Sequence, residues 1–252
     1  MALKFGDGTG YLLAVHCLFI FCANMDFISG ETLLIDKPIG WTSFDVVNKI
    51  RWNIKQKLKI KNIKVGHAGT LDPLATGLLI ICTGKNTKLI DDLIGQDKEY
   101  TGIILLGKTT PSYDLETEFD QEFDVSSISL AAIELVRQTF LGEQEQIPPI
   151  FSAKKINGKR AYDYAREGKE LVLKPNKINI KHFSIDASAF PQIVFSISCS
   201  KGTYIRSIAH DFGKKLGAGA TLTALRRTKS GACSIDDAKT VDGWLHEIIN
   251  AE

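Results

Sequence analysis

The chain of 252 residues carries 31 lysines and arginines against 29 aspartates and glutamates, a net charge of only +2. This balance excludes a uniformly polycationic binder, and an apolar content of 44% is ordinary for a soluble globular protein with a sizeable core, in one large domain or two small ones. The five cysteines form no CxxC pair, and the histidines do not pair at ligand spacing. These patterns disfavour a zinc site and favour a reducing compartment.

The first 24 residues contain an apolar run at 11–23 that only His16 interrupts. A membrane-spanning helix needs about 20 apolar residues, so this run is too short to cross a bilayer. As a signal peptide it has weak flanks, because Lys4 is the only positive charge before it and Asp7 offsets that charge. We favour a third interpretation, in which Met25 is the true start and residues 1–24 are a non-native or dispensable extension.

The next part of the chain predicts two strands and a helix. Residues 33–35 are a strand that enters a turn at 36–40, and a helix opens at 42–45 with Ser43 as its N-cap. The apolar face of this helix consists of Val46, Val47 and Ile50. The continuous apolar run at 78–82 is typical of a buried strand.

The rest of the chain continues to alternate strands and helices. Residues 100–106 predict a strand ending at Gly107, and residues 129–141 a helix stopped by Gly142 with an apolar face of Leu130, Ile133, Val136 and Phe140. A strand at 193–199 precedes a helix with a buried stripe of Ile205, Ile208, Ala209, Phe212 and Leu216. Because helices do not follow every strand, we expect an α+β fold with a mixed or antiparallel sheet.

The most distinctive segment is a glycine-punctuated loop at 66–77 with Asp72 at its centre. Its glycines allow backbone angles and close approaches that a side chain would block, and Pro73 forces Asp72 toward an extended conformation. A carboxylate presented from a constrained loop at a sheet edge is typical of a functional site. The alternative is a turn whose aspartate caps the next element.

A second cluster, residues 200–206, lies at a predicted strand-to-helix junction. There Arg206 can pair with a carboxylate and keep it ionised, while Tyr204 can stack on a base or donate a hydrogen bond. Lys201 is a candidate phosphate contact. The alternative is a surface arginine beside a half-buried tyrosine. The segment 84–87 resembles a P-loop only superficially, because position 79 is leucine and Asn86 replaces serine or threonine, so we discount nucleotide binding.

Charge is segregated along the chain. Residues 51–64 hold six lysines and arginines with no acid, and residues 114–124 hold six acids, which suits a protein that turns one face toward an anion. The segment 146–175 is basic with interleaved aromatics, as in a surface insertion that grips a phosphate backbone and stacks on bases. Its candidate RNA-binding residues are Lys154, Lys155, Lys159, Arg160, Tyr162 and Arg166. The alternatives are solvated helix faces and a plain exposed hairpin.

Several of these motifs, in this order, resemble those of the bacterial TruB-type tRNA pseudouridine synthases from about residue 28 to residue 240. The resemblance rests on residues 34–38, 66–77, 98–100, 147–149 with 152–154, 200–206 and 225–227. The form GHxGxLDPxAxG at 66–77 is specific, because other pseudouridine synthase families have different neighbours around the aspartate.

The resemblance implies the pseudouridine synthase fold, a central mixed or antiparallel sheet flanked by helices, with a thumb-like insertion at about 146–175 in a catalytic domain at 25–252. It implies isomerisation of uridine 55 in the T-loop of tRNA to pseudouridine, with the base flipped out of its stack. No cofactor or metal is implied. We expect a cytoplasmic monomer that binds the tRNA T-arm, with no membrane association and no protein partner.

The resemblance also implies roles for individual residues. Asp72 is the catalytic carboxylate, as nucleophile or base at the sugar, and Arg206 holds it ionised. Sequence alone does not separate attack at the sugar from attack at the base. Tyr100 stacks on the uracil near its C5 proton. The remaining pocket residues are Tyr204, Leu225, His67, which helps occupy the space left by the flipped base, and Lys37, which supports the Asp72 loop.

Two departures from the family pattern stand out. Ser112 stands where the family often has threonine, a change that we expect to be harmless. The chain ends at Glu252, from which we expect it to lack the C-terminal RNA-binding domain of many members. Two alternative functions remain: a non-catalytic tRNA-folding factor that uses the same surface, and a guide-RNA-dependent pseudouridine synthase of the dyskerin type.

Overall fold

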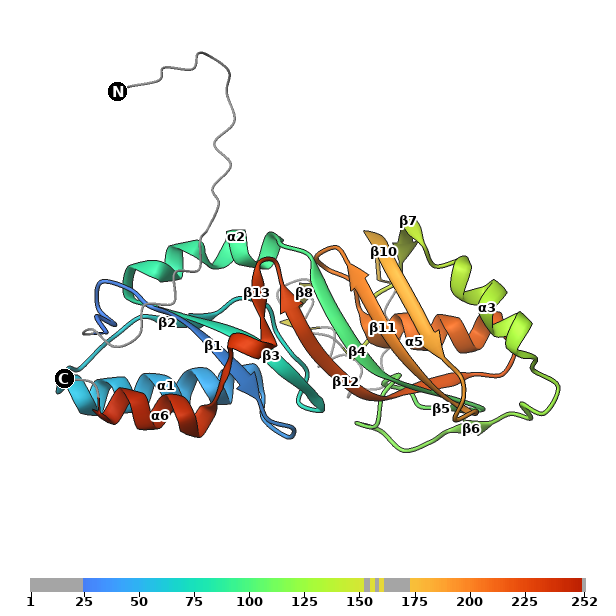
Figure 1. Ribbon diagram of the computed structural model, residues 1–252, viewed down its shortest axis with the longest axis horizontal. Coiled ribbons are helices and arrows are strands. Elements are labelled where there is room, and N and C mark those ends of the chain that lie inside the picture. Colours follow the sequence, from blue (N-terminus) through green and yellow to red (C-terminus); the bar gives the residue numbers. More distant parts are fainter. Residues whose placement is uncertain (1–24, 152–154, 157–158, 161–172, 251–252) are drawn as a thin grey trace, which may run out of the picture.

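The computed structural model describes residues 25–151, 155–156, 159–160 and 173–250. A ten-stranded sheet runs through the molecule in the order β14-β1-β3-β12-β4-β11-β10-β7, with β2 paired to β3 and β13 paired to β12 (Figure 1). The pairs β1–β14 and β3–β12 are parallel, and the other pairs are antiparallel. The predicted α+β fold with a mixed sheet is therefore confirmed.

The strands belong to one large sheet and two small hairpins. The main sheet consists of β1 (Thr32–Lys37), β2 (Val65–His67), β3 (Ala75–Thr83), β4 (Lys98–Leu106), β7 (Gly142–Gln146), β10 (Asn176–Asp186), β11 (Gln192–Cys199), β12 (Ala220–Ser230), β13 (Cys233–Ser234) and β14 (Lys239–Thr240). The hairpins are formed by β5 (Lys108–Thr109) with β6 (Gln121–Glu122), and by β8 (Lys155–Ile156) with β9 (Lys159–Arg160). The helices are α1 (Ser43–Leu58), α2 (Ile90–Gly95), α3 (Leu130–Gln138), α5 (Ile205–Lys215) and α6 (Val241–Asn250), with short 3₁₀ turns η1 (Gly84–Leu89) and η2 (Ile235–Asp237).

Helices cover both faces of the sheet at its β1–β3 end. Helices α1 and α6 lie side by side on one face, and α2 lies on the other (Figure 1). Leu79 and Ile81 belong to the core shared with α1, whereas Leu78 and Ile80 pack on the opposite face, toward Ile90 and Leu93. This double coverage explains why residues 78–82 are continuously apolar and fully buried.

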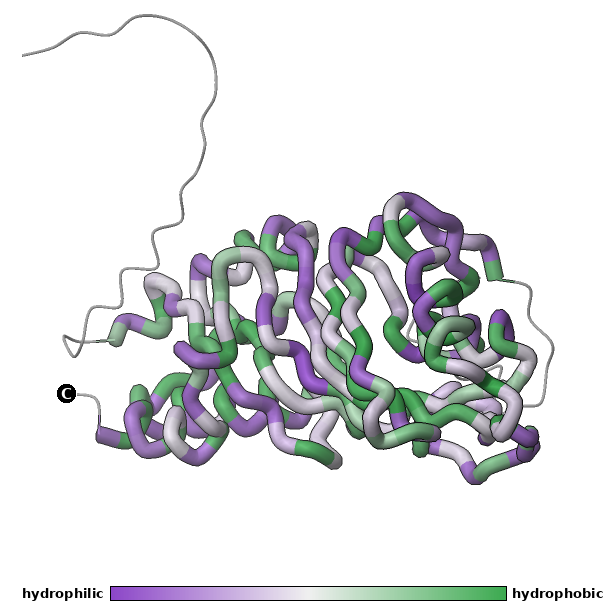
Figure 2. Tube along the Cα trace, turned by 45° about the vertical axis from the view of Figure 1, so that its right-hand side comes forward, coloured by the Kyte–Doolittle hydropathy of each residue, from purple (hydrophilic) through white to green (hydrophobic). Residues whose placement is uncertain are grey.

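The other end of the sheet packs on α5 and α3. Alternate residues of β11, Ile193 to Cys199, are buried as the sequence predicts. Their neighbours include a cluster of aromatic rings, Phe140, Phe183, Phe195 and Phe212. Hydrophobic and hydrophilic stretches alternate along much of the chain (Figure 2).

Two local predictions are wrong. Thr42, not Ser43, is the N-cap of α1: its hydroxyl accepts from the Asp45 amide at 3.0 Å, and the Asp45 carboxylate accepts from the Thr42 amide at 2.8 Å. The Ser43 hydroxyl instead binds the Leu71 backbone. In α3, Ile133 is buried, but Leu130, the first residue of the helix, is 66% exposed and does not belong to the buried face.

Candidate active site

The loop that carries Asp72 connects β2 to β3 and is fastened to the start of α1. The Ser43 hydroxyl accepts a hydrogen bond from the Leu71 amide at 2.9 Å and donates to the Leu71 carbonyl at 3.1 Å. The Gly40 amide donates to the Pro73 carbonyl at 2.8 Å. The residues on both sides of Asp72 are therefore fixed, so its carboxylate has a defined direction.

A glycine at the start of β3 lets this loop lie against β12. Gly77 has a φ of +97°, and a Cβ there would stand 2.3 Å from the Arg227 carbonyl oxygen. Any side chain would force the two strands apart, so glycine is required at this position by both backbone angle and space.

Asp72 forms an ion pair with Arg206 at the first turn of α5. The distance from Nε of Arg206 to Oδ2 of Asp72 is 2.9 Å, and Arg206 is only 4% exposed. The Asp72 side chain retains 39% of its accessible surface, so its carboxylate can be reached from solvent although protein atoms pack closely around it. Burial raises the pKa of Asp72, and the charge of Arg206 opposes that rise. The arginine therefore favours the ionised carboxylate in a place that disfavours it.

Arg206 is held by three further groups. Its guanidinium donates to the Ser112 carbonyl at 3.2 Å and to the Phe151 carbonyl at 2.8 Å, and its Nε lies 3.5 Å from Oδ2 of Asp114. Asp114 is buried and its charge also raises the pKa of Asp72. Sequence reasoning placed Asp114 in an acidic stretch and did not single it out. The available signal was its position two residues after Ser112, which already stood out in the family comparison.

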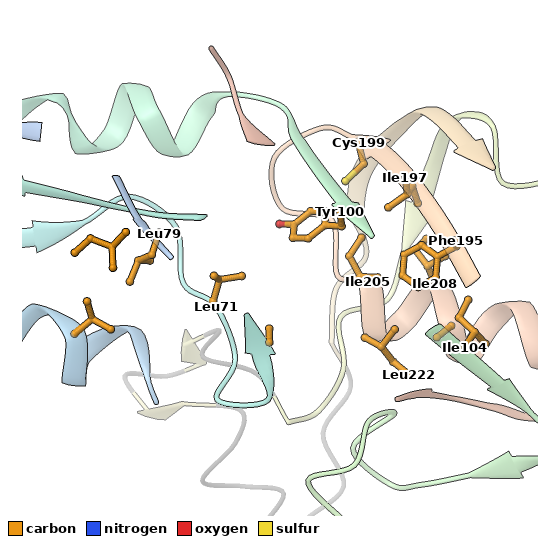
Figure 3. Close-up of a cluster of buried hydrophobic side chains, with 14 of the residues drawn as sticks. Leu71, Leu79, Tyr100, Ile104, Phe195, Ile197, Cys199, Ile205, Ile208 and Leu222 are labelled. Atoms are coloured by element: carbon orange, nitrogen blue, oxygen red, sulfur yellow. The ribbon is translucent and has the colours of Figure 1, made fainter. Parts of the chain in front are cut away.

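Five of the seven predicted site residues line one cavity, and two do not. A cavity of about 260 Å³ is lined by Asp72, Tyr100, Tyr204, Arg206 and Leu225. Figure 3 shows the Tyr100 ring reaching from β4 toward the loop that holds Leu71. His67 and Lys37 lie outside the lining. The cavity thus brings together five residues that the sequence placed in four separate motifs.

Lys37 and His67 lie around the Asp72 loop. The Lys37 ammonium is fully buried and donates to the carbonyls of Pro38, Trp41 and Pro73 at 2.9, 2.6 and 3.4 Å. Burial lowers the pKa of Lys37 to about 8. Burial, with the charge of Arg227, lowers the pKa of His67, whose Nδ1 has no hydrogen-bond partner in the described part of the chain. Lys37 is placed to brace the loop.

The predicted RNA-binding residues are only partly visible. Lys154, Tyr162 and Arg166 lie outside the described residues, and Lys155, Lys159 and Arg160 belong to the β8–β9 hairpin, of which the structure describes the backbone. Lys201 is exposed in the turn between β11 and α5. The adjoining Gly202 lines the cavity.

The start of the predicted insertion is bound to the start of α5. The Gln146 amide side chain is buried, accepts from the Tyr204 amide at 2.8 Å and donates to the Tyr204 carbonyl at 3.0 Å. The Ser207 hydroxyl donates to the Ile147 carbonyl at 2.9 Å. Sequence reasoning missed Gln146, because a glutamine at the end of a polar strand shows no sign of burial.

Two buried cations complete the cavity lining, Arg227 on β12 and Lys98 at the start of β4. Arg227 is 1% exposed and donates to the carbonyls of Leu78 at 2.7 Å and Gly69 at 3.1 Å. Lys98 is 7% exposed and donates to the carbonyls of Leu93, Ile94 and Gln96 at 3.4, 2.7 and 2.6 Å. In the sequence both residues belong to the motifs at 98–100 and 225–227, but nothing there indicates that they are buried. Charged residues in strands normally face solvent.

Comparison with known proteins settles the family. The model for the TruB family pseudouridylate synthase N-terminal domain matches residues 55–205, and that for the tRNA pseudouridylate synthase B C-terminal domain matches residues 206–251. The chain belongs to the TruB family. The predicted resemblance is therefore confirmed. The second match covers α5, β12 and α6, which pack on or within the same sheet as the rest of the described chain.

Curated relatives and solved structures agree with this membership. The chain is 52% identical over 226 residues to the tRNA pseudouridine synthase B of Parabacteroides distasonis, covering 88% of this chain and 96% of the relative. It is 52% identical over 214 residues to that of Flavobacterium johnsoniae, covering 84% and 93%. A chain in the crystal structure of a Cbf5-Nop10-Gar1 complex superimposes with a TM-score of 0.64 at 28% identity, and the match covers 88% of this chain but only 56% of that one.

Neither a membrane span nor a metal-ligand cluster occurs in the described parts of the chain. Within residues 25–151 and 173–250 and the β8–β9 hairpin, no helix combines the length and apolar character needed to cross a bilayer. In the same residues, no three histidine, cysteine, aspartate or glutamate side chains are grouped as metal ligands would be.

Proposed function

We propose that this protein isomerises uridine 55 in the T-loop of tRNA to pseudouridine, with Asp72 as the essential carboxylate. The observation that carries the proposal is the Asp72–Arg206 ion pair at a cavity that Tyr100 and Leu225 also line. The relatives named tRNA pseudouridine synthase B support the choice of tRNA as substrate.

The reaction begins with a base that leaves its stack. The uridine must turn outward to reach Asp72, at a cost of a few kcal/mol that contacts in the cavity offset. The Asp72 carboxylate, aimed by Arg206, attacks the nucleotide, and the C1′–N1 bond breaks. Tyr100 lies in the cavity wall, where its ring can stack on the uracil. The base turns, and C5 takes the place of N1 on the sugar.

The RNA contacts belong to the same proposal. The T-arm lies across the cavity mouth, with Lys201 and the insertion residues Lys154, Lys155, Lys159, Arg160, Tyr162 and Arg166 on its backbone and bases. His67 helps fill the space that the flipped base leaves. We further propose that the protein acts as a monomer in the cytoplasm.

Pseudouridine mapping tests this function. Total tRNA from a deletion strain should lack pseudouridine at position 55, and the wild-type gene should restore it while an Asp72→Asn gene does not. Purified protein should convert a T-arm RNA hairpin. Loss of the modification at a different position, or a purified protein that refolds tRNA without modifying it, would contradict the proposal.

A further inference from the structure

The charges around the cavity form two groups with different partners, named here the carboxylate end and the cationic end. At one end the guanidinium of Arg206 faces two carboxylates, Asp72 at 2.9 Å and Asp114 at 3.5 Å, so this group is negative on balance. At the other end are Arg227 and Lys98, and in the described residues neither forms an ion pair with a carboxylate.

The partners of these two cations explain why their charge is not cancelled. Arg227 and Lys98 donate to backbone carbonyls, which satisfy hydrogen bonds without supplying a negative charge. Burying a cation without an anion is costly, and Arg227 is the largest fully buried side chain of the described chain. A fold that tolerates this cost places a strong positive field in the wall of its cavity.

Tyr100 lines the same cavity, and charges of both groups influence its pKa. Burial raises the pKa of Tyr100, a hydrogen bond and the charge of Arg227 lower it, and the charge of Asp72 raises it. Burial lowers the pKa of Lys98, and the charge of Arg227 lowers it further. The field of Arg227 therefore extends over the part of the cavity where Tyr100 would meet the base.

We propose that Arg227, assisted by Lys98, accelerates the reaction by stabilising negative charge that develops on the pyrimidine ring. This inference rests on the proposed function. When the C1′–N1 bond breaks, its electron pair goes to N1, and a lone pair of Asp72 forms the bond to C1′. The uracil then carries one negative charge, spread over N1 and its carbonyl oxygens. Next, C5 attacks C1′, the Asp72–C1′ bond breaks and returns its pair to the carboxylate, and the ring loses the C5 proton and gains one at N1.

The two ends of the cavity match this separation of charge. The carboxylate end stabilises the electron-poor sugar, and the cationic end stabilises the electron-rich base. Preorganised charges aimed at a developing charge are among the strongest catalytic devices of enzymes. Arg227 acts through its field and through its hold on the Gly69 carbonyl of the Asp72 loop, so we regard it as a positioning and electrostatic residue.

The test compares two substrates that differ in the stability of the ring anion. T-arm RNA carrying 5-fluorouridine at the target site has a better leaving base than the same RNA with uridine. We expect Arg227→Met to slow single-turnover consumption of uridine at least about thirtyfold. The rate on 5-fluorouridine RNA divided by the rate on uridine RNA should be at least about threefold higher for Arg227→Met than for wild type. The reason is that the fluorinated base depends less on the positive charge of Arg227.

The controls separate charge from structure. Arg227→Lys keeps the charge, so its ratio should stay at the wild-type value even if its rate falls. Lys108→Met, which removes a surface charge paired with Glu122 at 2.7 Å, should change neither rate nor ratio. An unchanged ratio in Arg227→Met, or an equal rise in Arg227→Lys, would overturn the inference and leave only a structural role.

Folding failure does not block the test. If Arg227→Met does not fold, Lys98→Met carries the same comparison from a different strand, and there an unchanged ratio overturns the inference. Failure of the proposed function looks different, because wild-type protein would then consume neither substrate.

Discussion

Strands β3 and β12 are parallel neighbours in one sheet, with Arg227 opposite Gly77, yet they are built in opposite ways. From Leu78 to Cys82 β3 is apolar and fully buried, with helices over both of its faces. Strand β12 instead carries a fully buried arginine, Arg227, in its second half. The comparison teaches that β3 supplies stability, whereas β12 accepts an energetic penalty to place a charge beside the cavity that Asp72 also lines.

The loop leading into β3 should show the largest effect of any single change. We expect Asp72→Asn to lower the single-turnover rate on T-arm RNA at least about a thousandfold, because asparagine has neither the negative charge nor the nucleophilicity of the carboxylate. Binding of the RNA, measured by filter retention, should stay within about twofold of wild type. A variant that retains most of the rate would show that the loop is structural, like the strand it precedes.

A change within β3 itself should affect stability and leave the chemistry in place. Ile80→Ala removes a fully buried side chain and should lower the free energy of unfolding by about 3 kcal/mol, measured by urea denaturation. The matched control is Ile39→Ala, at a residue that is 65% exposed, where the change should be below about 0.5 kcal/mol. Equal decreases in the free energy of unfolding at the two positions would show that burial in β3 does not determine the contribution to stability.

The partner of Asp72 should show a smaller kinetic effect. Arg206→Ala leaves the carboxylate without its ion pair, and we expect the single-turnover rate to fall at least about tenfold, equivalent to about 1.4 kcal/mol of barrier. Arg206→Lys keeps the charge but loses the contacts to the Ser112 and Phe151 carbonyls, so its rate should lie between those of wild type and Arg206→Ala. A wild-type rate in Arg206→Ala would show that the ion pair does not contribute to the reaction.

The smallest expected effect concerns the buried lysine under the loop. The folded protein releases the Lys37 proton near pH 8, whereas the unfolded chain keeps it up to its ordinary pKa of 10.5. Unfolding therefore takes up a proton in this window, so the free energy of unfolding should gain a contribution that rises between about pH 8 and pH 10, on the order of 1 kcal/mol.

Lys37→Met should flatten that pH dependence, as measured by urea denaturation at several pH values. Lys85→Met is a suitable control because Lys85 is not among the groups that shift the pKa of Lys37, which are Asp72, Arg227 and Asp45. The prediction is contradicted if the Lys37→Met curve keeps the full wild-type slope above pH 8.

Sequence reasoning was most successful where a pattern has one physical cause. The apolar run at 78–82 and the alternation at 193–199 follow directly from burial, so both strands could be predicted. The pairing of Asp72 with Arg206 was anticipated through the resemblance to the TruB-type family, after the composition of the two motifs had singled out both residues. Ser43 was misassigned because a hydroxyl at a helix start can cap the helix or bind elsewhere, and only the position of Leu71 decides.

The missed residues share a different cause. Asp114, Gln146 and Arg227 are polar side chains that tertiary structure buries, and each is satisfied by atoms far away in the chain. Apart from the position of Asp114 two residues after Ser112, nothing local distinguishes them from exposed residues of the same type. Burial of a polar group depends on its partners, and these become visible only when the strands are placed in order.

The pairing of β7 with β10 bears on how this protein can vary among its relatives. Gln146 and Asn176 are direct partners in the ladder, so the 29 residues between them leave the sheet and return to it at adjacent positions. The entropy of closing a chain segment grows only with the logarithm of its length, so doubling that length costs about 0.6 kcal/mol. Insertions and deletions there are therefore inexpensive, and Gln146 continues to hold Tyr204 whatever the length. Under the proposed function, the length of the RNA-contacting segment can therefore change while the Asp72–Arg206 pair stays in place, provided that Phe151, whose carbonyl accepts from Arg206, is kept.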